Sequence, residues 1–396
     1  MRVLSPITWL LSFPKFYLHR ARVNKTGMPK GLKPPYFLLC NHNSFMDFMI
    51  MTRAIFPSRA NYVVAIDGFI GIEWLLRAVG GICNRKFTRS INLVRNMLQA
   101  RDNGDIVVLF PEARYSLCGT SAVLPESLGK MVRKMNVPVV TLIMHGHHIN
   151  SPFWNIGSRG VRPIESEMKL LLSQEETQQL PIEEINERMI SAFRYDDYAW
   201  QKEKGVRVKS KRRAEGLHKV LYQCPACSAE FKMTSSKHTL YCGNCGKSWD
   251  MSEYGELSAN DGDTEFSHIP DWYEWERSNV RSEVESGAYS FSANVRVESL
   301  PNAKGFVKFD ETGQLEHNME GFSLNGAYLG ESFEVLWAPA LLHSCHIEYD
   351  YKGRGDCVDL NTTDDTFYLF PEGCDFAVTK IALATEELHK HSALLH

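Results

Sequence analysis

Four cysteines in two close pairs restrict the folding of this chain more than any other part of its sequence. Cys224 and Cys227 form one C-x-x-C pair, and Cys242 and Cys245 form a second pair after an interval of fourteen residues. Each such turn directs two thiolates at one point, and four thiolates complete a tetrahedral zinc site without leaving a position for water. The spacing predicts a zinc ribbon over residues 223–255 with a structural zinc ion, and a pair of redox-active motifs is the alternative.

The chain is long enough to contain several folded domains. It has 396 residues, of which 44% are hydrophobic and 23% are charged. These values are typical of globular proteins and exclude a disordered or fibrous chain. No apolar run approaches the ~18–20 residues that a membrane-spanning helix needs.

The first block of the chain, residues 1–200, alternates short apolar segments with helical patterns. We expect buried strands at residues 36–40, 61–66, 106–110 and 137–144, and helices at residues 45–55 and 91–101. This alternation predicts an α/β domain in which helices flank a mixed sheet.

The remaining segments differ in charge and pattern. Residues 201–222 are rich in lysine and arginine and predict a basic linker that runs into a short helix. Residues 256–396 are acidic, and their short strands are separated by glycine, asparagine and aspartate. We predict a mainly β C-terminal domain here, with a helix at residues 271–284 and a terminal helix at residues 377–390 whose apolar side chains cover the sheet.

Charge is distributed unevenly along the chain. Residues 1–150 contain 19 Lys and Arg against 7 Asp and Glu, whereas the rest contains 25 against 40. A basic first block should attract anions such as phospholipid headgroups, coenzyme A, acidic carrier proteins or nucleic acid. The alternative is that these basic residues only keep the surface soluble.

A histidine and an aspartate five residues apart are the first candidates for chemistry. On a continuous helix, His42 and Asp47 would lie on different faces, because five residues turn the helix by ~500°. They can meet only if His42 lies in the turn before a helix and Asp47 lies in its first turn. A carboxylate in that position can orient the imidazole and leave Nε2 free to take a proton from a hydroxyl. A capping aspartate beside a packed histidine is the alternative.

Three further motifs follow in a set order. They are Gly80-Gly81-Ile82-Cys83-Asn84-Arg85, then Phe110-Pro111-Glu112-Ala113-Arg114-Tyr115, then Val137-Pro138 at the start of an apolar strand. Together with His42 and Asp47, this set resembles the glycerolipid acyltransferase family, whose best-known members are 1-acylglycerol-3-phosphate acyltransferases. The resemblance covers residues 30–150. The chain departs from the family pattern where Ala113 replaces a glycine and Arg114 comes one position early.

The resemblance implies roles for individual residues. His42 would be the general base, Asp47 would orient it, and Glu112 would support the site. Arg85 would bind the phosphate or a comparable headgroup of the acceptor. The other substrate-binding residues would be Lys86, Arg114, Asn43 and Ser44.

The implied reaction moves a fatty acyl chain from acyl-CoA or acyl carrier protein to a lyso-glycerophospholipid such as 1-acylglycerol-3-phosphate, in phospholipid biosynthesis. We expect a peripheral protein on the cytoplasmic face of the membrane, since the amino terminus has no secretory signal. Residues 7–18 are largely apolar and aromatic with basic neighbours, and such a segment can lie in the bilayer interface. Pro6 and Pro14 are expected to interrupt a continuous helix there.

Two alternatives belong to other classes of function. Zinc ribbons often bind nucleic acid, and the segment Lys209–Arg213 is basic, but the acidic C-terminal block would be repelled by duplex phosphates. A catalytically inactive membrane adaptor is the second alternative, and the intact set of His42, Asp47, Arg85 and Glu112 argues against it.

Overall fold

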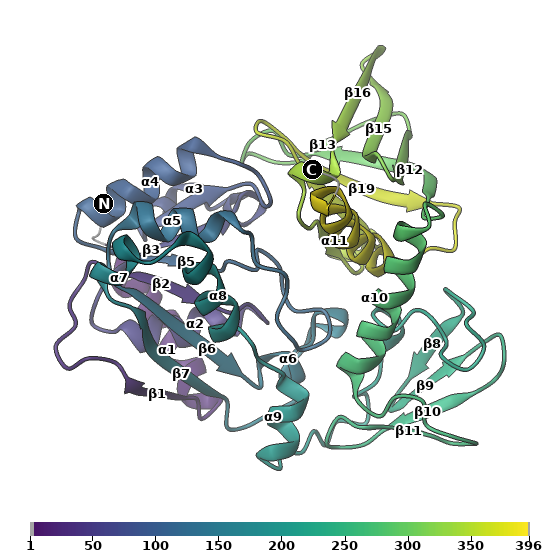
Figure 1. The fold of residues 1–396 in the computed structure, drawn as a ribbon, viewed down its shortest axis with the longest axis horizontal. Helices are drawn as coiled ribbons and strands as arrows, with labels where there is room; N and C mark the ends of the chain where they lie inside the picture. Colours follow the sequence, from purple (N-terminus) through teal and green to yellow (C-terminus); the bar gives the residue numbers. More distant parts are fainter. Residues whose placement is uncertain (1–3, 395–396) are drawn as a thin grey trace. The chain divides into compact units, whose positions relative to one another are not determined.

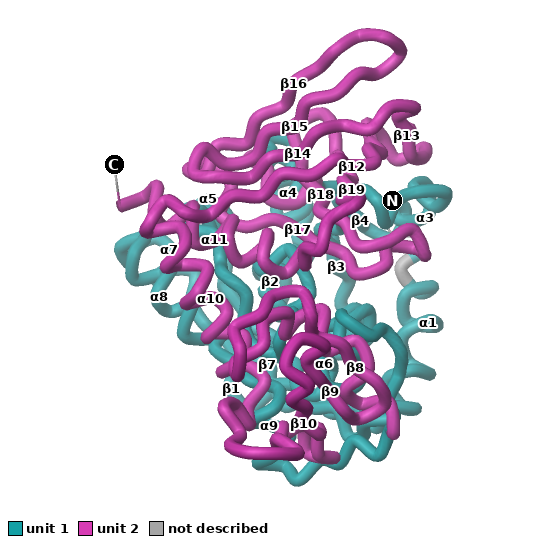
Figure 2. Tube along the Cα trace, turned by 90° about the vertical axis from the view of Figure 1, so that its right-hand side faces the viewer, with its two compact units in different colours: residues 1–84, 90–210 teal, residues 85–89, 211–396 magenta. Residues whose placement is uncertain are grey.

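The computed structural model describes residues 4–394 and divides into two compact units (Figures 1 and 2). The first unit comprises residues 1–84 and 90–210, and the second comprises residues 85–89 and 211–396. The short segment 85–89 therefore leaves the first unit and is grouped with the second. The predicted boundaries at residues 200, 222 and 255 remain predictions.

The first unit is built on a seven-stranded mixed sheet with the strand order β1-β7-β6-β2-β5-β3-β4. Only the pair β6 and β7 is antiparallel, and the other neighbours run parallel. The strands are β1 (Arg22–Gly27), β2 (Phe37–Cys40), β3 (Ala60–Ala65), β4 (Gly81–Asn84), β5 (Ile106–Leu109), β6 (Val139–His145) and β7 (Glu165–Leu172). The four predicted strands correspond to β2, β3, β5 and β6, and the predicted mixed sheet with flanking helices is confirmed.

Helices cover both faces of this sheet. The helices of the first unit are α1 (Ser5–Leu18), α2 (Met46–Ile55), α3 (Glu73–Ala78), α4 (Ile91–Asp102), α5 (Ser127–Met135), α6 (His147–Asn150), α7 (Gln174–Gln179), α8 (Ile182–Ala192) and α9 (Asp197–Glu203). Two hydrophobic cores result, because alternate side chains of each strand point to opposite faces. Leu38 packs in the core that contains Ile50 of α2, whereas Phe37 packs in the core that contains Val132 of α5.

Helix α1 corrects one expectation from the sequence. Pro6 lies in the first turn and Pro14 in the interior of a helix that continues from Ser5 to Leu18, so neither proline interrupts the helix as expected. Trp9 and Phe13 each contact the ring of Phe56, at centroid distances of 5.2 and 5.1 Å. These contacts anchor α1 at the end of α2, and packing of this kind outweighs the local cost of a proline.

The second unit contains two antiparallel sheets. The smaller one has the order β11-β10-β9-β8 and comprises β8 (Met233–Ser236), β9 (Thr239–Cys242), β10 (Ser248–Met251) and β11 (Leu257–Ala259). The larger one has the order β16-β15-β14-β12-β19-β18-β17, with β13 paired to β12. Its strands are β12 (Phe291–Ser299), β13 (Val307–Lys308), β14 (Gly313–Asn318), β15 (Gly321–Tyr328), β16 (Glu331–Trp337), β17 (His346–Glu348), β18 (Cys357–Asn361) and β19 (Thr366–Glu372). A mainly β C-terminal region is therefore present, as predicted.

Two helices accompany these sheets, α10 (Ile269–Glu285) and α11 (Val378–Leu394). The predicted apolar side chains of the terminal helix, among them Ile381 and Leu383, are fully buried. Arg277 of α10 donates to Glu386 and Glu387 of α11, so a buried ion-pair network joins the two helices. Within residues 4–394, no helix combines the length and apolar character needed to cross a membrane.

Candidate active site and metal centre

Three neighbouring strands bring the predicted catalytic residues to one end of the first unit's sheet. Strands β6, β2 and β5 lie side by side and run parallel, so their carboxyl ends meet. His42 follows β2 by two residues, Glu112 follows β5 by three, and His147 follows β6 by two. This is the edge at which ligands bind in open α/β sheets.

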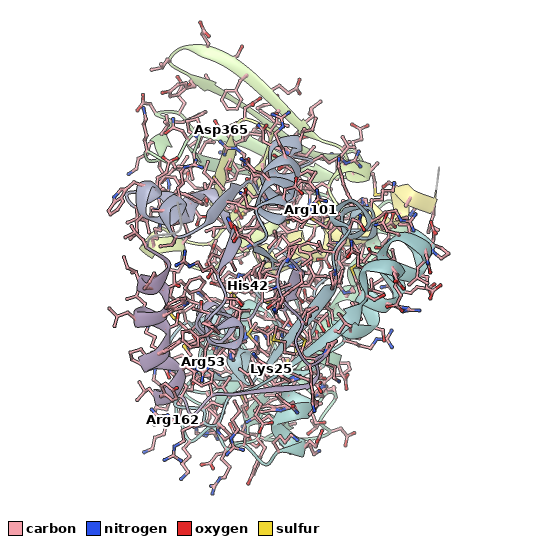
Figure 3. The ribbon with its side chains drawn as sticks, turned by 90° about the vertical axis from the view of Figure 1, so that its left-hand side faces the viewer. Lys25, His42, Arg53, Arg101, Arg162 and Asp365 are labelled. Atoms are coloured by element: carbon pink, nitrogen blue, oxygen red, sulfur yellow. The ribbon has the colours of Figure 1, made fainter. Side chains whose placement is uncertain are left out.

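His42 and Asp47 meet in the predicted geometry (Figure 3 labels His42). Helix α2 begins at Met46, so His42 lies in the preceding turn and Asp47 lies in the first turn. The Nδ1 atom of His42 is 3.0 Å from Oδ2 of Asp47. The carboxylate accepts Nδ1–H, and the His42 side chain remains 26% exposed. Nε2 is consequently the nitrogen that is available to a hydroxyl substrate.

The Asp47 carboxylate also organises the backbone of the turn. Its Oδ2 accepts the backbone N–H groups of Asn43 at 2.6 Å and Ser44 at 3.0 Å. Asp47 is fully buried, and burial alone would raise its pKa, but electrostatic interactions and hydrogen bonds with His147 and His42 lower the pKa to about 2. Asp47 therefore stays ionised and can stabilise an imidazolium at neutral pH.

Glu112 supports the site through the backbone. Its Oε2 accepts the N–H of His42 at 2.8 Å, and its Oε1 accepts the N–H of Ala122 at 2.8 Å. Burial raises the pKa of Glu112 to about 7, although these hydrogen bonds and the charge of Arg114 act in the opposite direction. Glu112 thus fixes the position of the His42 backbone and makes no direct contact with the imidazole nitrogens in the described structure.

Two aromatic rings enclose the His42 imidazole. Phe110 and Tyr115 each lie 4.3 Å from its centroid. Ala113 lies between Phe110 and Tyr115 in the sequence and has a φ of 54°, in the left-handed region that favours glycine. The turn therefore keeps the conformation that a glycine would adopt, although the family's glycine is replaced, and it places Tyr115 against the His42 ring.

The predicted substrate residues Asn43, Ser44 and Arg114 lie close to this centre but are buried. Asn43 Oδ1 accepts the hydroxyl of Tyr195 at 3.0 Å, and Ser44 Oγ accepts the N–H of Met46. Their roles in substrate binding remain predictions.

Sequence reasoning missed three residues that build the site. Asn41 exchanges hydrogen bonds with the backbone of Met144 and so ties the end of β2 to β6. Tyr195 and His147 contact Asn43 and Asp47 from distant parts of the chain. The motif His145-Gly146-His147-His148 at the end of a buried strand was the sequence signal for His147.

Arg85 is placed differently from the other predicted site residues. It belongs to the second unit, where its guanidinium donates four hydrogen bonds of 2.7–2.8 Å. The acceptors are the carbonyl oxygens of Leu300, Pro301 and Asp364 and the hydroxyl of Thr366. Lys86 lies in the same segment and is partly exposed. The roles of Arg85 and Lys86 in substrate binding therefore remain predictions.

Replacing Arg85 with lysine should reveal what these hydrogen bonds contribute. An ammonium cannot reach four acceptors at once, and a charge-assisted hydrogen bond contributes roughly 1.5–3 kcal/mol. We expect Arg85→Lys to lower the free energy of unfolding by about 2 kcal/mol in denaturant titrations. Arg89→Lys, an exposed position in the same segment, is the control. Unchanged stability together with a raised KM for the acceptor would instead favour headgroup binding by Arg85.

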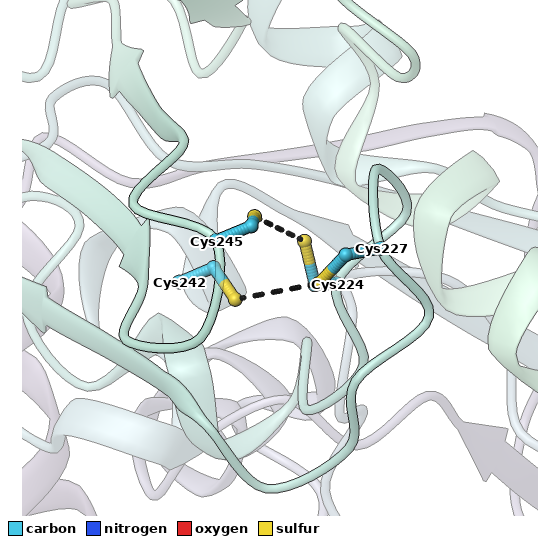
Figure 4. A group of neighbouring side chains, drawn as sticks. All are labelled: Cys224, Cys227, Cys242 and Cys245. Atoms are coloured by element: carbon cyan, nitrogen blue, oxygen red, sulfur yellow. Dashed lines mark hydrogen bonds between the residues drawn. The ribbon is translucent and has the colours of Figure 1, made fainter.

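The four cysteines of the two pairs come together in the second unit (Figure 4). Their sulfur atoms all lie within 4.8 Å of one another. Sγ of Cys224 is 3.7 Å from that of Cys245, and Sγ of Cys227 is 3.8 Å from that of Cys242. In a zinc–tetrathiolate with Zn–S bonds of ~2.3 Å, sulfur atoms are about 3.8 Å apart. The donor set and its spacing fit a zinc ion.

The two cysteine turns have matching backbones. The N–H of Ser228 donates to Cys224 O at 2.8 Å, and the N–H of Gly246 donates to Cys242 O at 2.9 Å. Ser228 and Gly246 both have positive φ, of 59° and 78°. Each turn thus closes in the same way and directs its two thiols inward.

Part of the first unit matches a known protein family. Residues 19–145 match the family model for acyltransferases. A similar solved structure is the crystal structure of the 1-acyl-sn-glycerophosphate (LPA) acyltransferase PlsC from Thermotoga maritima. The two chains share 18% sequence identity with a TM-score of 0.35, and the match covers 48% of this chain and 79% of the PlsC chain. Curated proteins give no match. The family model confirms the resemblance to the acyltransferase family over residues 19–145.

Proposed function

We propose that the protein transfers a fatty acyl chain from a thioester donor to the free hydroxyl of a lyso-glycerophospholipid. Residues 19–145 would form the acyltransferase domain. The donor would be acyl-CoA or acyl carrier protein, and 1-acylglycerol-3-phosphate is the proposed type of acceptor. The observation that carries this proposal is the contact between His42 and Asp47 beside Phe110 and Tyr115, at the carboxyl ends of the parallel strands.

The proposed reaction needs a base because a neutral hydroxyl attacks a thioester slowly. Nε2 of His42 takes the proton as the hydroxyl oxygen forms its bond to the carbonyl carbon. The carbon–sulfur bond then breaks, and the imidazolium returns the proton to the leaving thiolate. Asp47, ionised and held by the turn, stabilises the imidazolium between these two steps. The protein supplies no covalent nucleophile in this scheme.

The surface of α1 supports a peripheral position on a membrane. Phe16 is buried, whereas Leu10, Leu11 and Leu18 are more than half exposed. Phe45, at the start of α2, is also exposed, and the ammonium of Lys15 lies 5.9 Å from its ring centroid. An apolar face with basic neighbours is suited to a bilayer interface that contains anionic lipid. We propose that this face contacts the cytoplasmic surface of the membrane, where lysolipid acceptors are found.

We further propose that Cys224, Cys227, Cys242 and Cys245 hold a structural zinc ion in a zinc ribbon. The support is the spacing of the four sulfur atoms and the matching turns. Four protein ligands leave no position for a substrate, so the metal would stabilise the fold and take no part in acyl transfer.

A panel of acceptors tests the proposed reaction. Purified full-length protein is mixed with vesicles, radiolabelled acyl-CoA or acyl carrier protein, and one lysolipid at a time, and the products are separated by lipid chromatography. We expect labelled diacyl phospholipid with at least one lyso-glycerophospholipid and none with glycerol 3-phosphate. Absence of labelled lipid with every donor and acceptor, from protein that unfolds cooperatively, would contradict the proposal.

A further inference from the structure

A second histidine contacts the proposed catalytic carboxylate. Asp47 Oδ2 accepts from His42 and from the backbone of the turn, and its other oxygen, Oδ1, contacts Nδ1 of His147. His147 lies 100 residues further along the chain and is fully buried. The carboxylate is thus shared by two imidazoles, one partly exposed and one in the core.

The environment of His147 assigns the direction of this hydrogen bond. Among the described residues, its Nε2 has no hydrogen-bond partner. A proton on Nε2 would leave the lone pair of Nδ1 facing a buried carboxylate, which is repulsive. The favoured tautomer carries the proton on Nδ1 and donates it to Asp47. Electrostatic interactions also couple this pair to His42, which contacts Asp47, to His19 at the end of α1, and to Cys40 and Tyr195.

His147 is itself held in place by a second buried carboxylate. Asp197, at the start of α9, accepts the backbone N–H groups of Gly146 and His148, both at 3.1 Å. Gly146 has a φ of 84° and precedes the short helix α6, which begins at His147. The backbone on both sides of His147 is therefore held at the position from which its ring contacts Asp47.

We propose that His147 is a positioning residue for acyl transfer: it holds Asp47 by Oδ1 so that Oδ2 keeps the position that accepts Nδ1–H of His42. This inference rests on the proposed function, since the orientation of His42 matters only if His42 is the base. A carboxylate held from one side alone could rotate about its χ2 angle and lose the hydrogen bond to His42 for part of the time. Dual anchoring by His42, which follows β2, and His147, which follows β6, removes that freedom.

The wild-type protein provides a test that does not depend on activity. Nitrogen-15 NMR of histidine-labelled protein distinguishes the two imidazole tautomers by their chemical shifts. We expect His147 to carry its proton on Nδ1, with that proton shifted strongly downfield by the carboxylate. A resonance assigned to His147 that reports the Nε2–H tautomer would overturn the proposal, even if the protein is an active acyltransferase.

Variants of His147 test its effect on the reaction. In asparagine, the side-chain N–H₂ lies as many bonds from the backbone as Nδ1 of histidine, so His147→Asn can still donate to Asp47, whereas His147→Leu cannot. We expect His147→Leu to lower kcat about tenfold, with KM within twofold of wild type. NMR spectra of this variant should show an increased population of the Nε2–H tautomer of His42. His147→Asn should stay within threefold of wild-type kcat.

The neighbouring His148 provides the matched control. It is equally buried, but its ring packs against Tyr198 instead of contacting Asp47. His148→Leu should therefore leave the tautomer of His42 unchanged. The proposal fails if His147→Leu and His147→Asn lower kcat equally, or if His148→Leu changes the His42 tautomer as much as His147→Leu does. If wild type proves inactive, the proposed function fails, while the NMR spectra still decide the position of the His147 proton.

Discussion

Alanine in place of His42 should lower the rate of acyl transfer by about 10²–10⁴, the usual contribution of a positioned general base. The imidazole is the group that can take the hydroxyl proton, and its Nδ1 is already held by Asp47 at 3.0 Å. The loss should appear in kcat more than in KM, because the base acts in the transition state and does not bind the lipid. Steady-state rates of labelled phospholipid formation at several acceptor concentrations measure both parameters.

His145 is a suitable control for this experiment. Its side chain is 24% exposed, close to the 26% of His42, and its ring stacks on Trp200. His145→Ala removes a comparable imidazole from the same end of the sheet without touching Asp47, so we expect most of the activity to remain. Equal rates for wild type and His42→Ala would refute the assignment of His42 as the base and, with it, the proposed mechanism.

Loss of one cysteine ligand should have the largest effect on stability. A structural zinc site contributes roughly 10–16 kcal/mol in isolated zinc-finger peptides at neutral pH, and one serine removes a thiolate from the tetrahedron. We expect Cys242→Ser to lose bound zinc and to unfold the sheet β8–β11. If the substitution lowers the free energy of unfolding of the second unit by about 4 kcal/mol, the unfolding temperature of that unit falls by about 8–16 °C.

Two measurements check this result. Elemental analysis should find one zinc ion per wild-type chain and none in Cys242→Ser. Trp249 and Trp272 are buried with centroids 5.0 Å apart, so loss of the β8–β11 sheet should change tryptophan fluorescence. Cys374→Ser, an exposed cysteine of the same unit, should retain zinc and stability. Full stability and zinc content in Cys242→Ser would contradict a structural metal at this site.

Local patterns in the sequence predicted those parts of the site whose residues are close together in the chain. His42 and Asp47 are separated by little more than one helical turn, so the start of α2 alone decides whether they meet. The continuous apolar runs of β2, β5 and β6 identified a sheet buried on both faces, and parallel neighbours then place their carboxyl ends together. The expected break at Pro14 was wrong, because contacts of α1 with Phe56 are non-local.

The sequence by itself determined the two cysteine pairs and the His42–Asp47 pair, since backbone geometry over a few residues directs the side chains of each pair to one point. Only the tertiary structure decided that Asp47 is also held by His147, that Glu112 acts through the backbone of His42, and that Arg85 lies among carbonyl groups of residues 300–364. These contacts join residues 70 to 279 positions apart. No periodicity or spacing encodes such a distance, because it depends on how strands are ordered in the sheet and how loops between them close.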